Sequence, residues 1–542
     1  MAQYKRWLFA FAVIGITALS GCGLFQPTLQ TSAPGVLFDF RQIKLANGLR
    51  VVTLEDFSCP IVAVQVWYHV GSKNERPDRQ GYAHMFEHMM FKGTDRVGPR
   101  DHFSLINQVG GQVNGFTSFD RTAYVQTLPA DQLELALWLE AERMSFLKID
   151  QEAFDTERKV VEEELRMGQN RPYGTLWKKS LAGVFQVHPY RWMPIGQIAH
   201  LRATSVADLR DFWMRNYVPN NATLVIVGAV PHAKAQQMAR KYFEWIKPQP
   251  QPETVRIVEP PLKAPKTLTI SDENSPAPMV IMVWRTVATG HPDEHRLDLL
   301  SEILGGGQSS RLYLDLVSKK LWAVDASASC WNLEQDGLFF FQIVLSETGD
   351  PEKVIEAVKG HIRDIQKDGV LEEEWTKARN QKLKGLITQN LEVDNKAQAL
   401  GVASVERGSP SKANTILSDI QSVTRKQIQN AARKYLAEDR LLVIDVKKND
   451  RGMAAGEKDK EDMPVAAPEA HAPPPGRAGT VRPVDFPAQA PIGPLVKAEP
   501  QRIFDRSVLP NGLTVLVVPN KEVPFVTVSL GLLNGGWTEA RP

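Results

Sequence analysis

One short stretch of the sequence carries the residues best suited to chemistry, two histidines that flank a glutamate. His84, Glu87 and His88 occur in the order His-x-x-Glu-His. In a helix, His84 and His88 lie one turn apart on one face, where two imidazoles can hold a single metal ion. A carboxylate beside that ion can take the proton of a water molecule while the ion polarises a carbonyl, as amide hydrolysis requires. We therefore predict a zinc site with Glu87 as the general base; the alternative is an ordinary helix with these residues on its polar face.

A third ligand is expected from a helix that follows later in the chain. Glu162, Glu163 and Glu164 are consecutive, and such runs are usually surface charge. At about 100° per residue, Glu164 shares a face with apolar neighbours, whereas Glu162 and Glu163 point elsewhere. A carboxylate on an apolar face is costly unless it is paired or binds a metal, so Glu164 is the predicted third ligand. A buried arginine is the alternative partner. The apolar neighbours are Val160, Val161 and Met167.

The elements that must position these residues are a sheet and the helices packed on it. Asn47-Gly48 is a strong hairpin signal between two apolar strands, and the β-branched run 61–70 indicates another strand. The metal-binding helix follows, so it is expected to lie across the sheet. Pro129 begins a further helix, whose Glu140 and Glu142 are expected on the solvated face.

The spacing of the three ligands resembles that of a known peptidase family. In the pitrilysin, insulin-degrading enzyme and mitochondrial processing peptidase family, the zinc site is His-x-x-Glu-His plus a glutamate about 76 residues after the second histidine. Here 164 − 88 = 76. The similarity extends to stretches around the motif and further along the chain, namely Gly81-Tyr82-Ala83, Phe91-Lys92-Gly93-Thr94, Gly110-Gly111, His188-Pro189-Tyr190 and Asn221-Ala222-Thr223-Leu224-Val225-Ile226-Val227-Gly228.

The resemblance implies further site residues and one Zn²⁺ per chain. An edge strand with Asn114, Gly115, Phe116 and Thr117 would pair with the backbone of an extended substrate. Gly115 stands where the family more often has alanine, which would loosen the strand without abolishing the pairing. Glu157, seven residues before the third ligand, would orient the ligands as a supporting carboxylate.

The resemblance also implies an α+β fold of two related domains, each a mainly antiparallel sheet covered by helices. Together they would form half of a clamshell. A second half, fused or supplied as a separate chain, would close over a peptide or an unfolded polypeptide. Residues 45–51 return as 509–515, at an offset of 511 − 47 = 464, so we expect a second, truncated half to begin near residue 501.

Composition and these signals divide the chain into seven expected segments. They are 1–22 (lipoprotein signal peptide), 23–36 (tether), 37–247 (zinc-binding catalytic domain), 248–266 (connection), 267–447 (second, non-catalytic domain), 448–500 (linker rich in proline and alanine) and 501–542 (start of a second half).

The N-terminus has the pattern of a targeting segment. Lys5 and Arg6 precede the apolar run 7–19, which is too short for a permanent membrane span but suits a signal peptide. The run ends at Leu19-Ser20-Gly21-Cys22, which resembles a bacterial lipobox with lipid attached to Cys22. The prediction is a lipid-anchored protein of the cell envelope, because acyl chains would tether the N-terminus. Gly23, in place of an aspartate after the cysteine, favours the outer membrane, facing the periplasm, by resemblance to Gram-negative lipoproteins. A plain secretory signal is the alternative.

Composition excludes several classes of function. A formal net charge of +2 over 542 residues, without a basic stripe, argues against nucleic-acid binding. Cys59 and Cys330 lie too far apart in sequence to indicate a disulfide framework and are both predicted core residues. The run Gly305-Gly306-Gly307 lacks the Gly-Lys-Ser/Thr ending of a phosphate loop, so no nucleotide site is predicted.

These expectations converge on a zinc-dependent endopeptidase that acts on peptides or unfolded polypeptides. The alternative is a non-catalytic subunit for binding or assembly that shares the fold and needs a partner half. A lipoprotein with a purely structural zinc site is a third possibility, but such a site would require a fourth protein ligand and would not need Glu87 as a base.

Overall fold

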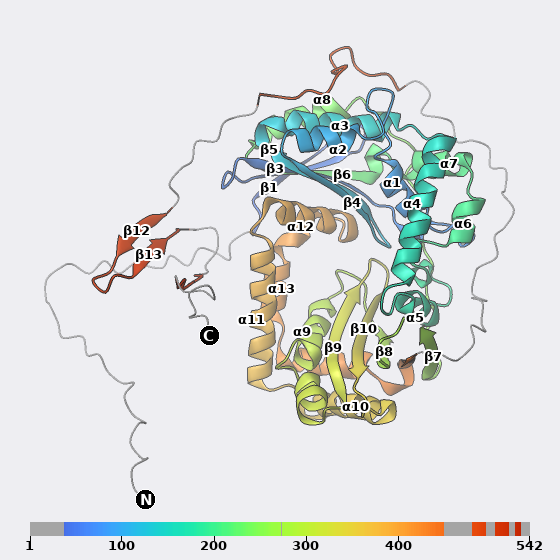
Figure 1. Cartoon of the computed structure of the whole chain (residues 1–542), viewed down its shortest axis with the longest axis vertical. Coiled ribbons are helices and arrows are strands. Elements are labelled where there is room, and N and C mark those ends of the chain that lie inside the picture. Colours follow the sequence, from blue (N-terminus) through green and yellow to red (C-terminus); the bar gives the residue numbers. More distant parts are fainter. Residues whose placement is uncertain (1–36, 273, 449–479, 495–503, 520–525, 533–542) are drawn as a thin grey trace, which may run out of the picture. The chain divides into compact units, whose positions relative to one another are not determined.

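The computed structural model describes residues 37–272, 274–448, 480–494, 504–519 and 526–532 (Figure 1). The predicted signal peptide, the lipidation site Cys22 and the tether 23–36 lie outside the described residues, as does most of the predicted linker. Among the described helices, none combines the length and apolar character needed to cross a membrane.

A six-stranded sheet forms the first domain. In spatial order its strands are β1 (Phe40–Lys44), β2 (Arg50–Glu55), β6 (Ala222–Gly228), β3 (Ile61–Tyr68), β5 (Thr122–Pro129) and β4 (Gln112–Thr117). All neighbours are antiparallel except β2 and β6. The turn between β1 and β2 contains Gly48 at φ +90°, which explains the hairpin signal. Strand β4 lies at an edge of the sheet, where it pairs with β5.

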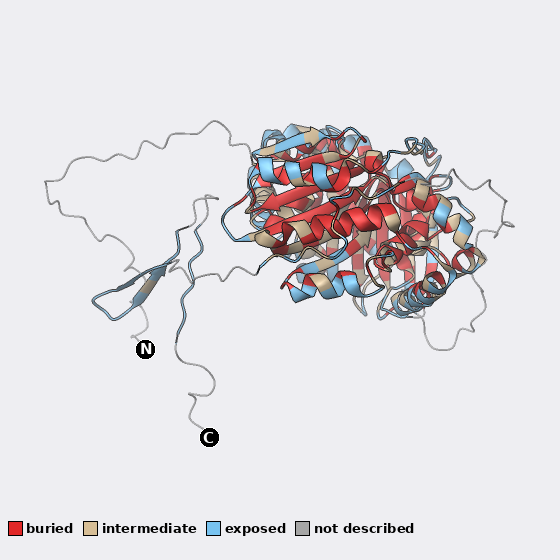
Figure 2. Cartoon of the chain, turned by 90° about the horizontal axis from the view of Figure 1, so that it is seen from above, coloured by how far each residue is buried: buried red, intermediate tan, exposed pale blue. Residues whose placement is uncertain are grey.

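The helices of the first domain pack mainly on one face of this sheet, where α2, α3 and α8 can be followed in Figure 1. Apolar residues of the strands and of these helices form one buried core (Figure 2), except that α5 packs against strands of the second sheet. The helices are α1 (Tyr82–Met89), α2 (Asp101–Gln108), α3 (Leu133–Phe146), α4 (Gln151–Gln169), α5 (Leu176–Val184), α6 (Ile198–Ala203), α7 (Val206–Asn216) and α8 (His232–Phe243).

The second domain repeats this arrangement with one strand fewer. Its spatial strand order is β7 (Lys266–Asp272), β11 (Leu442–Lys448), β8 (Met279–Arg285), β10 (Gly337–Leu345) and β9 (Ala323–Asn332). Only β7 and β11 are parallel, which matches the β2 and β6 pair of the first sheet. Its helices are α9 (Glu294–Gly305), α10 (Pro351–Asp368), α11 (Glu372–Gln389), α12 (Val393–Glu406), α13 (Ile416–Ser422) and α14 (Arg425–Tyr435). Two helix-covered, mainly antiparallel sheets confirm the predicted fold class.

The two domains share a polar and an apolar interface. Helix α12 packs on β3 and β6 of the first sheet, so closely that a Cβ atom at Gly401 would lie 2.2 Å from the Trp67 ring. Lys73, almost fully buried, is paired with Asp120 at 2.9 Å and with Glu334 in the turn between β9 and β10. These contacts fix the second domain against the first.

Two predictions about single residues fail. Cys59 is exposed, so the expectation that it is a core residue is wrong, whereas Cys330 is half-buried and packs against the core of the second domain. Glu140 and Glu142, expected on a solvated face of α3, are fully buried. Glu140 pairs with Arg143 and accepts a hydrogen bond from Gln126, which offsets the loss of hydration.

A separate hairpin reproduces the first two strands. Strands β12 (Asp505–Val508) and β13 (Thr514–Val517) pair with Val508 opposite Thr514, as Lys44 pairs with Arg50, and both residues are displaced by 464. Gly512 has φ +86° in its turn, close to the value of Gly48. The sequence repeat is therefore also a repeat of strand register.

Candidate metal centre

Helix α1 carries the motif and is held at its N-terminus by a buried carboxylate. Gly81 precedes the helix in the left-handed conformation, at φ +94°. Glu75 accepts hydrogen bonds from the backbone N–H groups of Gly81 and Ala83, at 2.8 and 2.9 Å. Ala83, Met85, Phe86 and Met89 face the core, so that His84, Glu87 and His88 remain half-buried on the other side.

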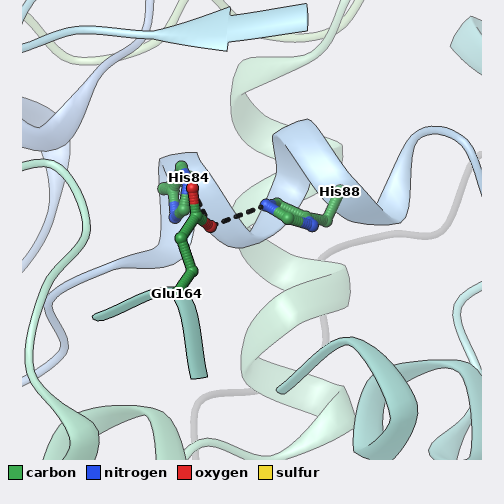
Figure 3. A group of neighbouring side chains, drawn as sticks. All are labelled: His84, His88 and Glu164. Atoms are coloured by element: carbon green, nitrogen blue, oxygen red, sulfur yellow. Dashed lines mark ion pairs between the residues drawn. The ribbon is translucent and has the colours of Figure 1, made fainter. Parts of the chain in front are cut away.

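The structure brings the three predicted ligands together (Figure 3). Oε2 of Glu164, on α4, lies 3.6 Å from Nε2 of His84 and 3.5 Å from Nε2 of His88. Donor atoms about 2.1 Å from a tetrahedral zinc ion are separated by about 3.4 Å, so the observed spacing fits that ion.

The surroundings of Glu164 and His84 also fit a metal ion. Among the described residues, no hydrogen-bond donor meets the buried Oε2 of Glu164, which leaves this atom free to coordinate. Burial, with a smaller effect of His88, lowers the pKa of His84 to about 3. The ring is therefore neutral near neutral pH, the form that a zinc ligand requires.

Glu157 lies where a supporting carboxylate is expected. Its Oε2 is 3.2 Å from Nδ1 of His88, and its Oε1 is 2.5 Å from Nζ of Lys92. Burial alone would raise the pKa of Glu157, but the hydrogen bonds to His88 and Lys92 lower it, so the group stays ionised. A carboxylate on Nδ1 fixes the ring and directs Nε2 toward the metal position.

Glu87 and the predicted substrate strand are neighbours. Asn114, Gly115, Phe116 and Thr117 all lie on the edge strand β4. A Cβ atom at Gly115 would lie 3.1 Å from Cγ of Glu87, so glycine leaves room for the base at this point. Burial raises the pKa of Glu87, while a hydrogen bond with the Thr117 side chain opposes that shift.

A cavity of about 620 Å³ lies beside β4, and residues of the second domain form part of its wall. Its acidic members Glu392 and Asp394 are not predicted from the sequence, because they lie almost 280 residues after β4 in the chain. The lining residues are Ser58, Cys59, Ile61, Gln112, Val113, Asn114, Val125, Gln126, Thr127, Leu391, Glu392, Val393 and Asp394.

The face of α4 that carries Glu164 is less buried than predicted. Val160 and Met167, expected on a buried apolar face, are 46% and 52% exposed. Glu162 is the more buried glutamate of the run and pairs with Arg202 at 2.7 Å. Glu164 lies instead at the border between the buried and the exposed face of α4, where its carboxylate can reach the two histidines.

A second His-x-x-Glu-His occurs in the second domain, at His291, Glu294 and His295. Helix α9 begins only at Glu294, so His291 lies outside it and the two histidines do not share a helix face. Glu294 instead accepts hydrogen bonds from Arg407 and from the backbone N–H of Gly290, both at 2.6 Å. The motif is therefore repeated in the sequence, but its two histidines are not arranged like those of the metal site.

Glu75, which the motif does not reveal, should make stability depend on pH. Burial raises the pKa of Glu75 to about 8, against hydrogen bonds from the Ala83 and Gly81 N–H groups. Between about pH 4.5 and about pH 8 the folded chain then holds a proton that the unfolded chain releases, so the free energy of unfolding falls as pH rises. We expect the difference in unfolding free energy between wild type and Glu75→Gln to decrease over this range in denaturant titrations. The exposed Glu163→Gln is the control, and a difference that stays constant with pH would contradict the shift.

The chain is similar to known peptidases in sequence. The family model described as "Insulinase (Peptidase family M16)" matches residues 50–191, and the "Peptidase M16 inactive domain" model matches residues 204–382. The zinc protease PqqE of Helicobacter pylori is 32% identical over 359 residues, which cover 65% of this chain and 79% of that protein. The probable mitochondrial-processing peptidase subunit beta of Arabidopsis thaliana is 22% identical, covering 74% of this chain and 77% of that protein.

Solved structures show the same fold. A protease from Helicobacter pylori superposes with a TM-score of 0.72 at 26% identity, covering 76% of this chain and all of that chain. The first half of the periplasmic protease PqqL from Escherichia coli superposes with a TM-score of 0.65 at 19% identity, covering 76% of this chain and 92% of that chain. The relative from Helicobacter pylori at 32% identity, together with the two family models, establishes that this chain belongs to peptidase family M16.

Proposed function

We propose that the chain is a zinc-dependent endopeptidase that hydrolyses peptides or unfolded polypeptides in the bacterial cell envelope. The observation that carries the proposal is the position of the Glu164 carboxylate. Its oxygen has no hydrogen-bond donor among the described residues and lies at zinc-ligand spacing from His84 and His88. Glu87 is close by, but its carboxylate is not part of that ligand group.

The side chains have separate tasks in this proposal. His84, His88 and Glu164 would hold one Zn²⁺, and Glu157 would keep His88 in its binding orientation. When bound, the ion polarises the substrate carbonyl and makes water more acidic. Glu87 takes the proton of the attacking water and later gives it to the amine that leaves; its raised pKa brings it closer to neutral pH, where it can do both.

Strand β4 supplies the surface for the substrate. It pairs with β5 on one side, so its other edge can pair with an extended peptide. Gly115 places that edge beside Glu87. Edge pairing requires a backbone in extended form, which favours peptides and unfolded chains over folded proteins, and the cavity beside Asn114 can take a side chain of the substrate.

The name of one family model raises the alternative of a non-catalytic binding subunit. The "inactive domain" model matches residues 204–382, a range that contains none of the three ligands and not Glu87. The label therefore applies to a range that begins at the end of the first domain and continues into the second, and it leaves the site on α1 and α4 as it stands.

Location and partner rest on separate observations. Lys5, Arg6, the apolar run and Cys22 support export and lipid anchoring in the outer membrane. A second peptidase-like half as partner is supported by the hairpin β12 and β13, which repeats the register of β1 and β2. PqqL of Escherichia coli, whose structure is similar, is a periplasmic protease.

The test is hydrolysis by the purified chain from Gly23 onward, with its metal content measured on the same sample. We expect about one zinc per chain and cleavage of an unstructured peptide library, lost with a chelator and restored by zinc. A folded protein of similar composition is the control and should resist. Zinc without cleavage would favour the binding subunit, and absence of zinc would refute the proposal.

A further inference from the structure

The described part of the predicted linker, residues 480–494, contacts the first domain beside α3 and α8 (Figure 1). Arg482 donates hydrogen bonds to Glu142 through Nε at 2.6 Å and through a terminal nitrogen at 2.7 Å. It also donates to Asp95 at 2.9 Å, and its guanidinium carbon lies 3.6 Å from the centre of the Phe146 ring. One side chain of the linker thus binds two carboxylates and an aromatic ring of the first domain.

Glu142 shows that the first domain is built to receive this arginine. The Glu142 side chain is completely excluded from solvent, and its other hydrogen bond comes from the Thr94 hydroxyl at 2.8 Å. A buried carboxylate without a cationic partner strongly destabilises a fold. Arg482 is the cation that satisfies it, although 340 residues separate the two in the chain.

Phe486 supplies an apolar anchor four residues later. It is 5% exposed and belongs to the core cluster of the first domain. Its ring packs edge-on against Tyr242 and Trp245, with ring centres 5.5 and 5.4 Å apart. An aromatic side chain buried in a pocket of this kind dominates the affinity of many peptide interfaces.

Backbone groups of the segment are also bound. The carbonyl of Pro487 accepts hydrogen bonds from the Trp138 indole at 3.0 Å and from Arg96 at 2.9 Å. The side-chain amide of Gln132 both accepts from the N–H of Gly493 and donates to its carbonyl, at 3.0 and 3.1 Å. The contacts therefore extend along the segment from Arg482 to Gly493.

Neighbours of the two anchors point to solvent. Val484, which lies between them, is fully exposed and Val481, just before Arg482, is 77% exposed, whereas the Arg482 side chain is only 14% exposed and Phe486 is buried. A passive linker would not show this selective burial of one cationic and one aromatic residue. It is the pattern of an extended peptide bound to a preformed surface.

We propose that the surface around Glu142, Trp138 and Trp245 is a binding site for residues 480–494, and that this segment anchors the following chain to the first domain. From Pro494 to Phe504 there are ten residue steps (504 − 494), which span at most roughly 35 Å. From Lys448, at the end of the second domain, there would be 56 steps (504 − 448). The anchor thereby raises the local concentration at which the chain beyond it meets the first domain.

The proposal predicts that the anchor holds after the covalent connection is cut. A specific protease site is inserted between Lys448 and Thr480 of the full chain, and the cleaved protein is examined by size exclusion and native mass spectrometry. We expect the fragment that begins near Thr480 to remain bound to the rest of the chain in equal amounts. Combining Arg482→Glu with Phe486→Ala should weaken this binding by about 100-fold or more. The exposed Val484→Ala is the matched control and should behave as wild type.

Two results would overturn the proposal. One is release of the wild-type fragment after cleavage, and the other is undiminished retention in the double variant. A trans experiment guards against a folding defect of the variant. A synthetic peptide of residues 480–494 should bind the cleaved double variant, whose own segment is disabled, whereas the same peptide with Arg482→Glu should not. None of these measurements depends on hydrolysis, so they remain decisive even if the proposed peptidase activity fails.

Discussion

The Glu87→Gln variant is expected to keep its zinc, while its rate of peptide hydrolysis falls by about 100-fold to 10,000-fold. The amide has the shape of the carboxylate but cannot take up a proton. Glu87 is not part of the group of ligand atoms formed by His84, His88 and Glu164, so the ion should stay. Zinc content by elemental analysis and turnover of an unstructured peptide, measured on one preparation, test both halves of this statement.

The matched control for this change is Glu163→Gln. Glu163 is exposed and is paired with Arg166 on the surface of α4, so its neutralisation should alter neither zinc content nor turnover. Loss of zinc from Glu87→Gln would show that Glu87 is a ligand, and retained turnover would show that another group moves the proton.

Glu164→Gln is expected to weaken zinc binding by about 100-fold or more, since losing a direct ligand should exceed the 10-fold to 100-fold effect of a supporting residue. The Glu164 oxygen lies near both histidine nitrogens, at 3.6 and 3.5 Å. Competition with a chromophoric chelator measures the affinity directly.

The two neighbouring glutamates separate the possible causes of that loss. Glu163→Gln should leave the affinity unchanged. Glu162→Gln should lower the melting temperature, because Glu162 is almost buried and pairs with Arg202, but it should leave zinc binding intact. Equal loss of zinc affinity in all three variants would mean that charge on α4, and not coordination by Glu164, supports the site.

Local pattern predicted much of the fold and the position of the metal motif. Asn47-Gly48 forms the expected turn, and the helix over His84 and His88 is present, since both follow from neighbouring residues. The family resemblance and the fold class are confirmed by the relatives and by the two sheets. The roles of the site residues stay predictions until the variants are made.

The features that the sequence could not predict are those that depend on residues far away in the chain. Glu142 was expected in solvent because its partner Arg482 lies 340 residues away, in a stretch whose composition is that of a linker. Glu164 was identified on an apolar face that is in fact exposed at Val160 and Met167. Helical periodicity shows which residues share a face, but it does not show which face meets the rest of the protein.

The place of β6 in the first sheet has a consequence for the order of folding. β6 lies between β2 and β3 and pairs with both, although it follows α1 and α4 in the chain. A chain synthesised only as far as α6 already carries all three metal ligands, yet it lacks the strand that joins the two parts of the sheet. Such long-range pairing is slow compared with local helix formation. The first sheet, on which the helix of the two histidines packs, is therefore completed only after α1, α4 and α6 have been made, and the metal ligands gain their final support late in folding.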